Sequence, residues 1–364
     1  MEFLRATLRR VIHLSAAKFF VLTGVEKDSD SLVSVLWSGT EQQLAYFQGR
    51  IFGINSVTLT RIGRRPMILM GRLMTRFDCS FCVIAVEQQF VPLVRRDGDF
   101  LLPLWVNCDV PLTDQREYAK SASIRADIRN ISDNKFTWKL SDKRDDFDFF
   151  FEKIYVPTVT ISHGRAALTA SYENRLRKFK AGTMKLLQVM RDDEFLAGVA
   201  IDFDGGVPTL RDSGVLNGSS ELKKTGAISA TYLFAMDYLE SKGYSNVSFG
   251  LSRSFLDDGV LNYKRKFRPI ITTGSIDGVL MRIRRLDDPT RSMLRASPCL
   301  SWQDRTLHRT YFRDPTEDHS ERQSRKVRSK WSFGIDAESV FDVSSDALRE
   351  LNTQRSRPTP CDQS

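Results

Sequence analysis

The chain has 364 residues, of which 41% are hydrophobic, and this length suits one large globular domain or two ordinary ones. The formal charge of +9 favours anionic partners such as phosphates, nucleotide cofactors, nucleic acid or a membrane surface. Five scattered cysteines exclude a disulfide framework, and no apolar run reaches the roughly 18 residues of a membrane-spanning helix. Arg, His and Lys interrupt the N-terminal stretch where a signal peptide would be apolar, so we expect a cytoplasmic protein.

Residues 1–115 mix short strand-like runs with helix-like stretches and contain no motif that indicates chemistry. The strand-like runs are KFFVLTGV, SVTLTRI, CSFCVIAV and FLLPLWV. Cys79 and Cys82 form a C-x-x-C, but no second pair or His pair at ligand spacing accompanies it. We therefore expect these thiols to pack in a core and predict no metal site. The region is predicted to be a smaller α/β region, with a degenerate half of the following domain as one interpretation.

The pattern becomes sharper from about residue 116. The run DDFDFFFEKIYVP has aromatic residues at helical spacing and predicts a helix that packs by one aromatic stripe and stops at Pro157. A second helix is predicted in SYENRLRKFKAG, with Ser171 as its N-cap and Gly182 as its stop. Three strand-length runs joined by tight turns follow, in TMKLLQVM, FLAGVAIDF and VPTLRDSGVL. Two helices therefore lead into an antiparallel meander.

After the meander, the stretch from Ala227 to Leu239 is apolar nearly all round and ends at Lys242-Gly243, which predicts a helix buried against a sheet. The run NVSFG reads as the next strand. It opens into a polar loop and a cationic segment, FGLSRSFLDDGVLNYKRKF, at residues 249–267. This order of elements predicts an α/β layered domain with a mixed, mostly antiparallel sheet flanked by helices.

These segments resemble the GNAT acyltransferase superfamily, and within it the Fem-type and related acetyltransferase-domain proteins of bacterial cell-envelope metabolism. The likeness covers about residues 120–285. It rests on IYVPTVTISHG, AGVAIDFDGG, the terminal KGY of the buried helix and, most specifically, the 249–267 stretch. The matching positions there are Gly250, Ser252-Arg253, Asp258-Gly259, Tyr263-Lys264 and Phe267.

Two features depart from the family pattern. Arg268 stands where the family has a Gly after the final aromatic residue, which affects the turn behind the cationic segment. The R/Q-x-x-G-x-G/A pyrophosphate loop of acetyl-CoA-dependent members is also missing, and KKTGA occupies its place. Fem-type proteins commonly lack that loop too, so its absence is compatible with the predicted fold. It leaves the identity of the acyl donor open.

The resemblance implies acyl transfer from acyl-CoA, with acetyl-CoA as the expected donor, to an amine of a small or envelope-related precursor. Together with the sequence patterns and composition, it predicts an N-terminal region at 1–115, the transferase domain at 116–285, a basic C-terminal extension at 286–352 and a disordered Pro/Ser/Arg-rich tail at 353–364. In the superfamily a splayed strand gives a backbone amide to the acyl carbonyl, and here the resemblance assigns that strand to residues 200–203.

Three side chains are candidates for proton transfer. His163, in the segment Y-x-P-x₅-H-G, is the first choice for the base, because His changes charge near neutrality; a structural His is the alternative. Asp212 in LRDSG is a second choice and would need burial to act as a base. Tyr263 occupies the family position of a Tyr that protonates the leaving group, although packing alone would also explain it.

Four residues are predicted to form a cradle for a diphosphate or another anionic group. Lys224 and Gly226 stand at the predicted start of the buried helix, whose free N–H groups suit phosphate. Arg253 and Lys264 project from the loop after the strand.

Two other functions remain open from the sequence. The same fold could take an aminoacyl group from charged tRNA and place it on a peptidoglycan precursor, which the basic last quarter allows. Alternatively, a degenerate transferase could bind nucleic acid or an acidic polymer without catalysis, although no aromatic-basic motif of an RNA-binding domain is present.

Overall fold

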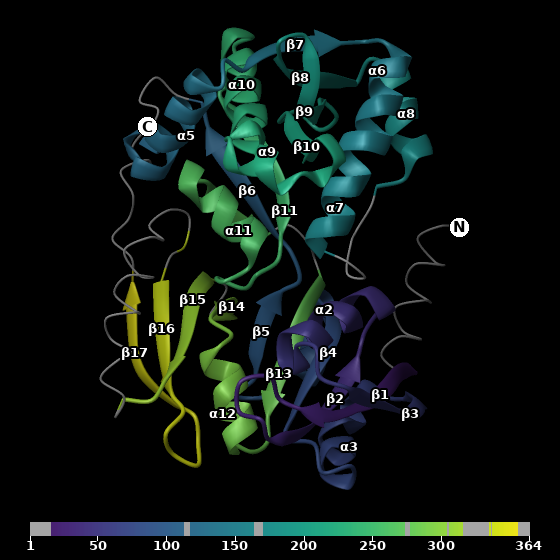
Figure 1. Cartoon of the computed structure of the whole chain (residues 1–364). Coiled ribbons are helices and arrows are strands. Elements are labelled where there is room, and N and C mark those ends of the chain that lie inside the picture. Colours follow the sequence, from purple (N-terminus) through teal and green to yellow (C-terminus); the bar gives the residue numbers. More distant parts are fainter. Residues whose placement is uncertain are drawn as a thin grey trace. The chain divides into compact units, whose positions relative to one another are not determined.

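The structure is a computed structural model that describes residues 16–112, 117–163, 170–273, 277–303, 306–315, 335 and 337–355. Its described residues form two compact units (Figure 1). Unit 1 draws on residues 1–106, 252–262 and 273–364, and unit 2 on residues 107–251 and 263–272. No helix among the described residues is both long and apolar enough to cross a bilayer.

Unit 2 is built on a seven-stranded sheet with the order β12-β6-β11-β10-β9-β8-β7. Its strands are β6 (Val106–Pro111), β7 (Thr137–Ser141), β8 (Met184–Arg191), β9 (Glu194–Asp202), β10 (Thr209–Val215), β11 (Asn246–Ser252) and β12 (Ile270–Thr273). Its helices are α5 (Ala122–Asp133), α6 (Arg144–Phe149), α7 (Val156–His163), α8 (Tyr172–Lys180), α9 (Ser220–Lys224) and α10 (Ala227–Ser241). The helix α11 (Gly259–Lys264) begins in unit 1 and ends in unit 2. The predicted α/β class, with a mostly antiparallel sheet flanked by helices as in the GNAT fold, is confirmed.

The predicted helices and meander of unit 2 are present. Ser171 caps α8 by accepting a hydrogen bond from the Asn174 amide, and the aromatic stripe of the first helix is buried, with Phe147 and Phe150 each 1% exposed. The strands β8, β9 and β10 pair antiparallel in sequence order. The helix α10 is buried along most of its length, as its all-round apolar pattern predicts.

The prediction that the first helix stops at Pro157 is wrong. A π-helical turn (Phe150–Tyr155) joins α6 to α7, and Pro157 lies in the first turn of α7. A proline lacks an N–H and disrupts an established α-helix, but it is tolerated in a first turn, where that donor has no intrahelical partner. The helix therefore continues through Pro157 and carries the chain to His163.

Unit 1 contains a ten-stranded sheet with the order β17-β16-β15-β14-β5-β13-β4-β2-β1-β3. Its strands are β1 (Ala17–Val25), β2 (Leu32–Ser38), β3 (Val57–Arg65), β4 (Phe81–Glu87), β5 (Phe100–Pro103), β13 (Asp277–Ile283), β14 (Cys299–Gln303), β15 (Thr306–Arg313), β16 (Ala337–Asp342) and β17 (Arg349–Arg355). Its helices include α2 (Glu41–Phe52), α3 (Met70–Arg76), α4 (Val91–Val94) and α12 (Asp288–Arg295). The four strand-like runs of the N-terminal region therefore correspond to strands.

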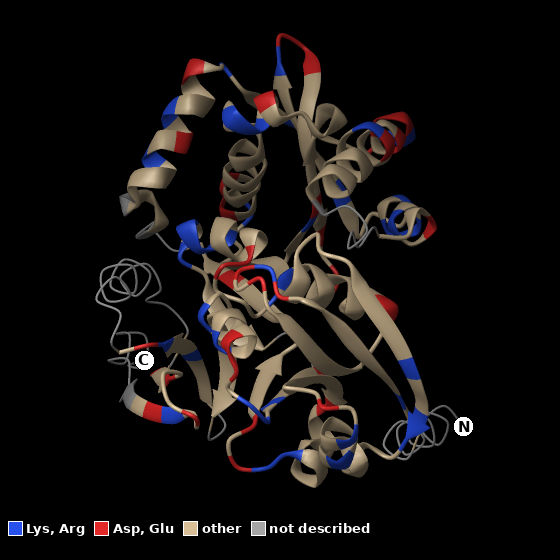
Figure 2. Cartoon of the chain, turned by 60° about the horizontal axis from the view of Figure 1, so that its bottom comes forward, with Lys and Arg blue, Asp and Glu red and all other residues tan. Residues whose placement is uncertain are grey.

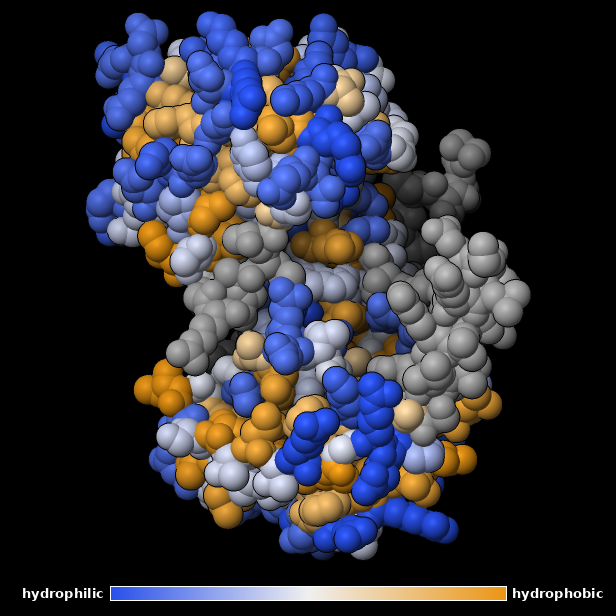
Figure 3. Space-filling model, turned by 90° about the vertical axis from the view of Figure 1, so that its right-hand side faces the viewer, coloured by the Kyte–Doolittle hydropathy of each residue, from blue (hydrophilic) through white to orange (hydrophobic). Residues whose placement is uncertain are grey.

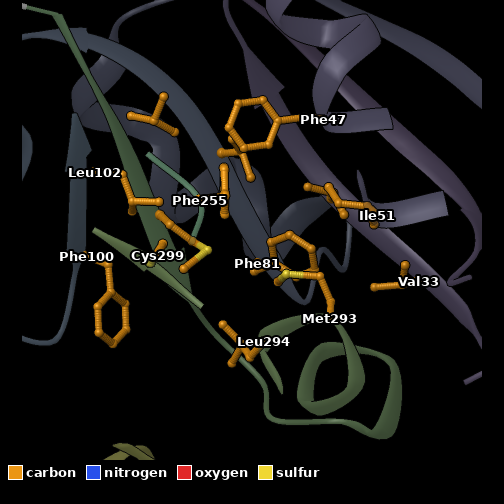
Figure 4. Packing of buried hydrophobic residues seen from close by; sticks show 14 of the residues in the cluster. Val33, Phe47, Ile51, Phe81, Phe100, Leu102, Phe255, Met293, Leu294 and Cys299 are labelled. Atoms are coloured by element: carbon orange, nitrogen blue, oxygen red, sulfur yellow. The ribbon is translucent and has the colours of Figure 1, made fainter. Parts of the chain in front are cut away.

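One face of this sheet is sealed by α2 and α12. Phe47 and Ile51 of α2 pack with Phe81 of β4, and Met293 and Leu294 of α12 pack in the same buried cluster (Figure 4). Cys299 is buried among them. At roughly 25 cal/mol per Å² of apolar surface removed from water, a cluster of this kind supplies much of the stability of the unit.

The two sheets exchange one strand each: in each sheet, one strand comes directly after a strand of the other sheet in the chain. The strand β6 comes directly after β5, yet it lies between β11 and β12 in the sheet of unit 2. In the same way β13 comes directly after β12, yet it lies between β4 and β5 in the sheet of unit 1. The order β2-β4-β13-β5 in unit 1 therefore matches β10-β11-β6-β12 in unit 2.

This exchange corrects the predicted domain limits. The compact units are not contiguous stretches that divide at residues 115 and 285, because β13 to β17 complete the sheet that β1 to β5 begin. The described part of the predicted C-terminal extension, including α12, belongs to unit 1, and residues 353–355 belong to β17 instead of a disordered tail. The cationic run at 321–330 lies outside the described residues.

Candidate active site

The parallel strands β10 and β11 separate almost as soon as they meet. Their register contains one pair, Thr209 with Ser248, so β11 has no register partner for residues 210–213 of β10, and the Val215 amide donates to Thr158 Oγ1 of α7. Backbone amides on the edge of a strand that lacks a neighbour are available to a ligand. The side chains from Thr209 to Ser213 are polar or partly exposed except for Leu210. This edge of β10 is therefore not covered by β11.

The strand β10 is also bulged beside this edge. Its pairing with β9 runs from Arg211 opposite Ala200 to Gly214 opposite Gly198, so Asp212 and Ser213 stand opposite the single residue Val199. Asp212 has a φ of +53°, an uncommon conformation for a residue with a side chain. A bulge of this kind redirects a strand and frees backbone groups, which is why bulges are common next to active sites.

The expectation that residues 200–203 supply the carbonyl-binding amide is wrong. Ala200 lies in β9, which pairs with β8 on one side and β10 on the other. Its neighbours Ile201 and Asp202 are also paired on both sides. The strand that separates from its neighbour is β10, so the open backbone edge lies one strand further along the meander.

Asp212 is held by a charged partner from the helix α8. Arg175 donates to it through Nε and through Nη2, the latter at 3.3 Å from Oδ1, and the two side chains are 19% and 8% exposed. The Tyr155 hydroxyl accepts a hydrogen bond of 2.9 Å from the Ala170 amide. Burial, together with the nearby charge of Asp212, raises the pKa of Tyr155 to about 12. The two hydrogen bonds from Arg175 hold Asp212 in the bulge, and a two-donor contact of this kind stabilises the charged carboxylate.

This geometry changes the role expected of Asp212. A general base needs a carboxylate whose charge is not already satisfied, whereas the Asp212 carboxylate is engaged by the guanidinium of Arg175. The structure thus favours Asp212 as a positioning residue that keeps β10 bulged. Sequence reasoning missed both Arg175 and Tyr155, since neither lies in a local motif and each is brought to β10 only by the packing of its helix.

The other two proton-transfer candidates lie in different settings. His163 is the last residue of α7, and its side chain is outside the described part of the structure. Tyr263 is partly exposed, and its hydroxyl lies 3.2 Å from Ser229 Oγ. Burial raises the pKa of Tyr263 well above its usual range, so the phenol stays protonated at neutral pH. Its ring packs with Tyr232 and Phe267. Both roles, base for His163 and acid for Tyr263, stay predictions.

The first turn of α10 is covered by α5. Gly226 is the N-cap, with a φ of +85°, and a Cβ built there would lie 3.2 Å from Asn130 Cβ. Ala227 and Ser229, in the same turn, are 0% and 4% exposed. Lys266 adds a further cover, because its ammonium donates to Ser229 Oγ at 3.0 Å and to the Asp127 carboxylate. The amides of this turn are therefore not presented to a diphosphate.

The predicted cradle is not formed within either unit. Lys224 is the last residue of α9 instead of the first of α10, and its exposed ammonium pairs with Glu221 at 2.9 Å. Lys264 is 4% exposed and donates to the carbonyls of Gly250 and Leu251 at 3.1 and 2.9 Å. These bonds anchor α11 to the end of β11. A side chain used in this way stabilises the fold, so Lys224, Gly226 and Lys264 do not make the predicted phosphate site.

Arg253 occupies an aromatic cage in unit 1. Its guanidinium carbon lies 3.8 Å from the ring centre of Trp105 and 4.6 Å from that of Tyr46. The side chain is 9% exposed, and burial lowers the pKa of Arg253. Among the described residues, Arg253 Nη1 and the Tyr46 hydroxyl have no hydrogen-bond partner. Both residues line the same small cavity, where they could bind one anionic oxygen or a water molecule.

The cysteines behave as core residues. Cys79, Cys82, Cys108 and Cys299 are buried, and none of the four forms a disulfide. Burial raises the pKa of Cys79 to about 11 and that of Cys82 to about 12, so both remain thiols at neutral pH. In the part of the chain that the structure describes, no group of three or more His, Cys, Asp or Glu side chains could hold a metal ion. Cys79, before β4, and Cys82, within it, pack in the same buried cluster, as predicted.

Comparisons with known proteins add limited information. No protein-family model matches the chain, and no curated protein matches it. Among solved structures, it is similar to the C-terminal domain of an Agrobacterium fabrum protein assigned as a lysylphosphatidylglycerol synthetase, with a TM-score of 0.36, 11% identity, and coverage of 79% of this chain and 89% of that one.

Two further solved structures show a likeness of the same strength. One is L-PGS from Bacillus licheniformis, with a TM-score of 0.35, 14% identity, and coverage of 80% of this chain and 94% of that one. The other is a tandem GNAT protein from the clavulanic acid biosynthesis pathway, with a TM-score of 0.31, 8% identity, and coverage of 69% and 76%. These scores are too low to decide function, so the functional assignment depends on the strands and side chains described above.

Proposed function

We propose that the protein is an N-acyltransferase and that unit 2 carries the reaction. The observation that supports this most is the separation of β10 from β11 after a single residue pair, directly beside the bulge at Asp212 and Ser213. Acyl transfer to an amine requires a fixed hydrogen-bond donor at the position where the carbonyl oxygen becomes negative. The unpaired edge of β10 supplies backbone donors without requiring a special side chain.

The reaction itself is a direct substitution at the acyl carbon. The amine nitrogen attacks the carbonyl, the new C–N bond forms, and the bond from the acyl carbon to the leaving group breaks. The amine gives its proton to a base, for which His163 is the proposed residue, and the leaving group takes a proton, for which Tyr263 is the proposed donor. Arg175 and Asp212 keep the bulge in place, so the donor edge does not have to reorganise during the reaction.

The surroundings of the α10 terminus bear on which acyl donor the protein uses. An acyl-CoA would bring a diphosphate, yet α5 covers the helix terminus that was expected to bind it. An aminoacyl-tRNA carries its acyl group as an ester on ribose and requires no diphosphate site there. The formal charge of +9 is also suited to a polyanionic donor. We therefore propose two donors, acyl-CoA and aminoacyl-tRNA. The covered terminus of α10 favours aminoacyl-tRNA.

The acceptor is proposed to be an amine of a small or envelope-related precursor. The test is a transfer assay with a panel of amines, using acetyl-CoA, longer acyl-CoAs and a mixture of charged tRNAs as separate donors. Amine-dependent loss of the acyl group from one donor class is the expected result. Absence of amine-dependent loss with every donor would contradict catalysis and would favour the non-catalytic binding protein.

One variant connects that assay to the site. His163→Gln should lower turnover by about a hundredfold or more if His163 is the base, since a positioned general base contributes about that much. A loss of only a few fold would make His163 a structural residue.

A further inference from the structure

Unit 1 contains an open cavity of about 890 Å³ that is lined by arginines and by no carboxylate. A cavity of this size is within the range of small-molecule sites. On the face of unit 1 that Figure 3 shows, hydrophilic and apolar side chains lie next to one another. Lys and Arg residues occur in both units (Figure 2), and the lining of this cavity contains five arginines and no Asp or Glu. Its arginines are Arg72, Arg76, Arg96, Arg282 and Arg284.

Two of these arginines are neutralised by carboxylates outside the cavity lining. Arg282 donates to both oxygens of Asp99, at 2.8 and 2.6 Å, and also to the Val94 carbonyl at 2.8 Å. Asp99 is buried, so this pair forms a fixed wall between β13 and the end of α4. Arg284 pairs with Asp78 at 2.6 Å. Their charges are compensated within the protein.

The other three arginines lack a carboxylate partner among the described residues. Arg72 and Arg76 are exposed on α3, and Arg96 follows α4. Gly71 belongs to the same cavity lining and has no side chain to fill the space above it. A Cβ built at Gly71 would lie 3.5 Å from Arg96 Nη1 and 3.8 Å from Arg282 Nη1. Because Arg282 is already paired with Asp99, the Arg96 guanidinium is the group beside Gly71 whose charge a bound anion would compensate.

We propose that this cavity binds a small organic diphosphate. The three uncompensated arginines match the two to three negative charges of a diphosphate at neutral pH. Guanidinium groups also fit phosphate oxygens through paired N–H donors. The apolar part of the lining, which includes Ile68, Leu69 and Ile283, would contact the organic portion of the ligand. Ile68 is 72% exposed, so its burial by such a ligand would be favourable.

The site lies wholly on residues of unit 1 and does not depend on the proposed acyl transfer. Titration calorimetry of the full chain at low salt would use inorganic phosphate, pyrophosphate and ADP as separate probes. ADP and pyrophosphate are expected to bind, with phosphate at least tenfold weaker because it offers fewer charges. Vesicles of an anionic phospholipid form a second arm. Vesicle binding that ADP displaces would indicate that the diphosphate is lipid-linked, whereas ADP binding without vesicle binding would indicate a free one.

Substitutions separate this cavity from general surface charge. Arg72→Gln and Arg96→Gln should each weaken ADP binding by about tenfold or more, and Gly71→Ala should weaken it with the charge unchanged. Arg61→Gln, on an exposed position of β3 outside the cavity, is the matched control and should bind as the wild type does. The proposal is overturned if neither pyrophosphate nor ADP binds, or if the control loses as much affinity as the cavity variants.

Discussion

A parallel strand pair lies at the corresponding position of the sheet in each unit, and the two pairs differ in the number of residues that are paired. In unit 1, β2 and β4 are paired at four successive positions, from Val35 with Phe81 to Ser38 with Ile84. In unit 2, β10 and β11 are paired at one position. The strand exchange makes the comparison direct, because β13 flanks β4 as β6 flanks β11.

The side chains of these strands account for the difference. Residues 35–38 of β2 are all buried, and Leu36 and Trp37 pack in apolar clusters on opposite faces of the sheet. The corresponding strand β10 carries Arg211, Asp212 and Ser213, which are only partly buried, and its bulge shifts the register. A strand that is apolar on both faces is stabilised by continuous pairing, whereas a polar, bulged strand can leave one edge free. We infer that unit 2 carries the catalytic site. In unit 1, continuous pairing of β2 with β4 closes the corresponding strand edge.

The largest predicted effect comes from removing the ion pair that holds the bulge. Asp212→Ala leaves the Arg175 guanidinium without its carboxylate in a mostly buried position. We expect a loss of about 2–3 kcal/mol in the free energy of unfolding, somewhat below the range for a fully buried pair. Transfer activity should fall by at least a hundredfold, because the donor edge of β10 is no longer fixed. Urea denaturation and the transfer assay measure the two effects.

A double-mutant cycle separates the ion pair from backbone strain. Arg175→Ala combined with Asp212→Ala should show a coupling energy of about 1–3 kcal/mol. Asp212→Gly removes the same carboxylate but suits the φ of +53° at this position, so it should be more stable than Asp212→Ala by about 1 kcal/mol. Near-zero coupling would show that the bulge does not depend on Arg175.

The next effect concerns the close packing behind β10. A Cβ at Gly214 would lie 2.5 Å from the Ile154 carbonyl oxygen and 2.8 Å from Thr158 Oγ1. Thr158 Oγ1 accepts from the Val215 amide at 3.0 Å, so helix and strand cannot separate freely. Gly214→Ala should therefore destabilise the protein by about 1–3 kcal/mol. Thermal unfolding with circular dichroism would measure it.

Unit 1 provides the matched control for that substitution. A Cβ at Gly49 in α2 meets nothing within 4 Å, and Gly49→Ala should stabilise the helix by up to about 1 kcal/mol. A loss of stability in Gly214→Ala together with a gain in Gly49→Ala would confirm that the packing behind β10 is the tighter of the two. Equal effects would contradict the proposed rigidity of the bulge.

A smaller effect is expected at Arg268, where the sequence departs from the GNAT pattern. Arg268 adopts a φ of +54° and a ψ of +51°, the left-handed conformation that the glycine of the family would adopt more easily. Arg268 therefore keeps the turn at a cost in conformational free energy. Arg268→Gly should stabilise the protein by about 1 kcal/mol, whereas Arg265→Gly, in the preceding 3-10 turn, should destabilise it by a similar amount. A loss of stability in Arg268→Gly would indicate that the side chain contributes more than the turn costs.

Local patterns in the sequence predicted the elements of unit 2 well, because each depends on neighbours in the chain. Ser171 before α8, the all-round apolar run of α10 and the tight turns of the meander are signals of that kind. The strand exchange was not predictable in this way. A strand such as β6 has the same apolar alternation whichever sheet it joins, so its destination depends on long-range pairing.

The candidate site was predictable only in part, for the same physical reason. The segment LRDSG was singled out for Asp212, and this residue does lie at the bulge. Its partner Arg175 belongs to a helix 37 residues earlier, and no spacing rule connects them. The cradle failed because it assumed that cations near a helix start point toward it, whereas Lys264 is used to bind the carbonyls of β11. A charge in a sequence indicates a partner, but the fold decides which one.

The smallest predicted effect is a change in acid sensitivity at the β9–β10 pairing. Asp202 is 1% exposed and accepts from Lys178 and from Arg211, each at 2.9 Å. Burial alone would raise the pKa of Asp202, but the bonds from Lys178 and the neighbouring cations outweigh it and hold the pKa below its usual range. A carboxyl whose pKa is lower in the folded state stabilises the protein above its unfolded pKa of about 4. That contribution is lost as the pH falls from about 4 toward the folded pKa.

Asp202→Asn tests this sign. The variant should be less stable than the wild type at pH 7, and the gap in melting temperature should narrow as the pH is lowered below about 4, where the wild-type carboxyl becomes protonated. Asp97→Asn, at an exposed position of unit 1, is the control and should change the melting temperature little at either pH. A gap that stays constant from pH 7 to pH 3 would mean that Asp202 stabilises β9 and β10 through packing instead of charge. The opening beside β10 would then not depend on the ion cluster that borders it.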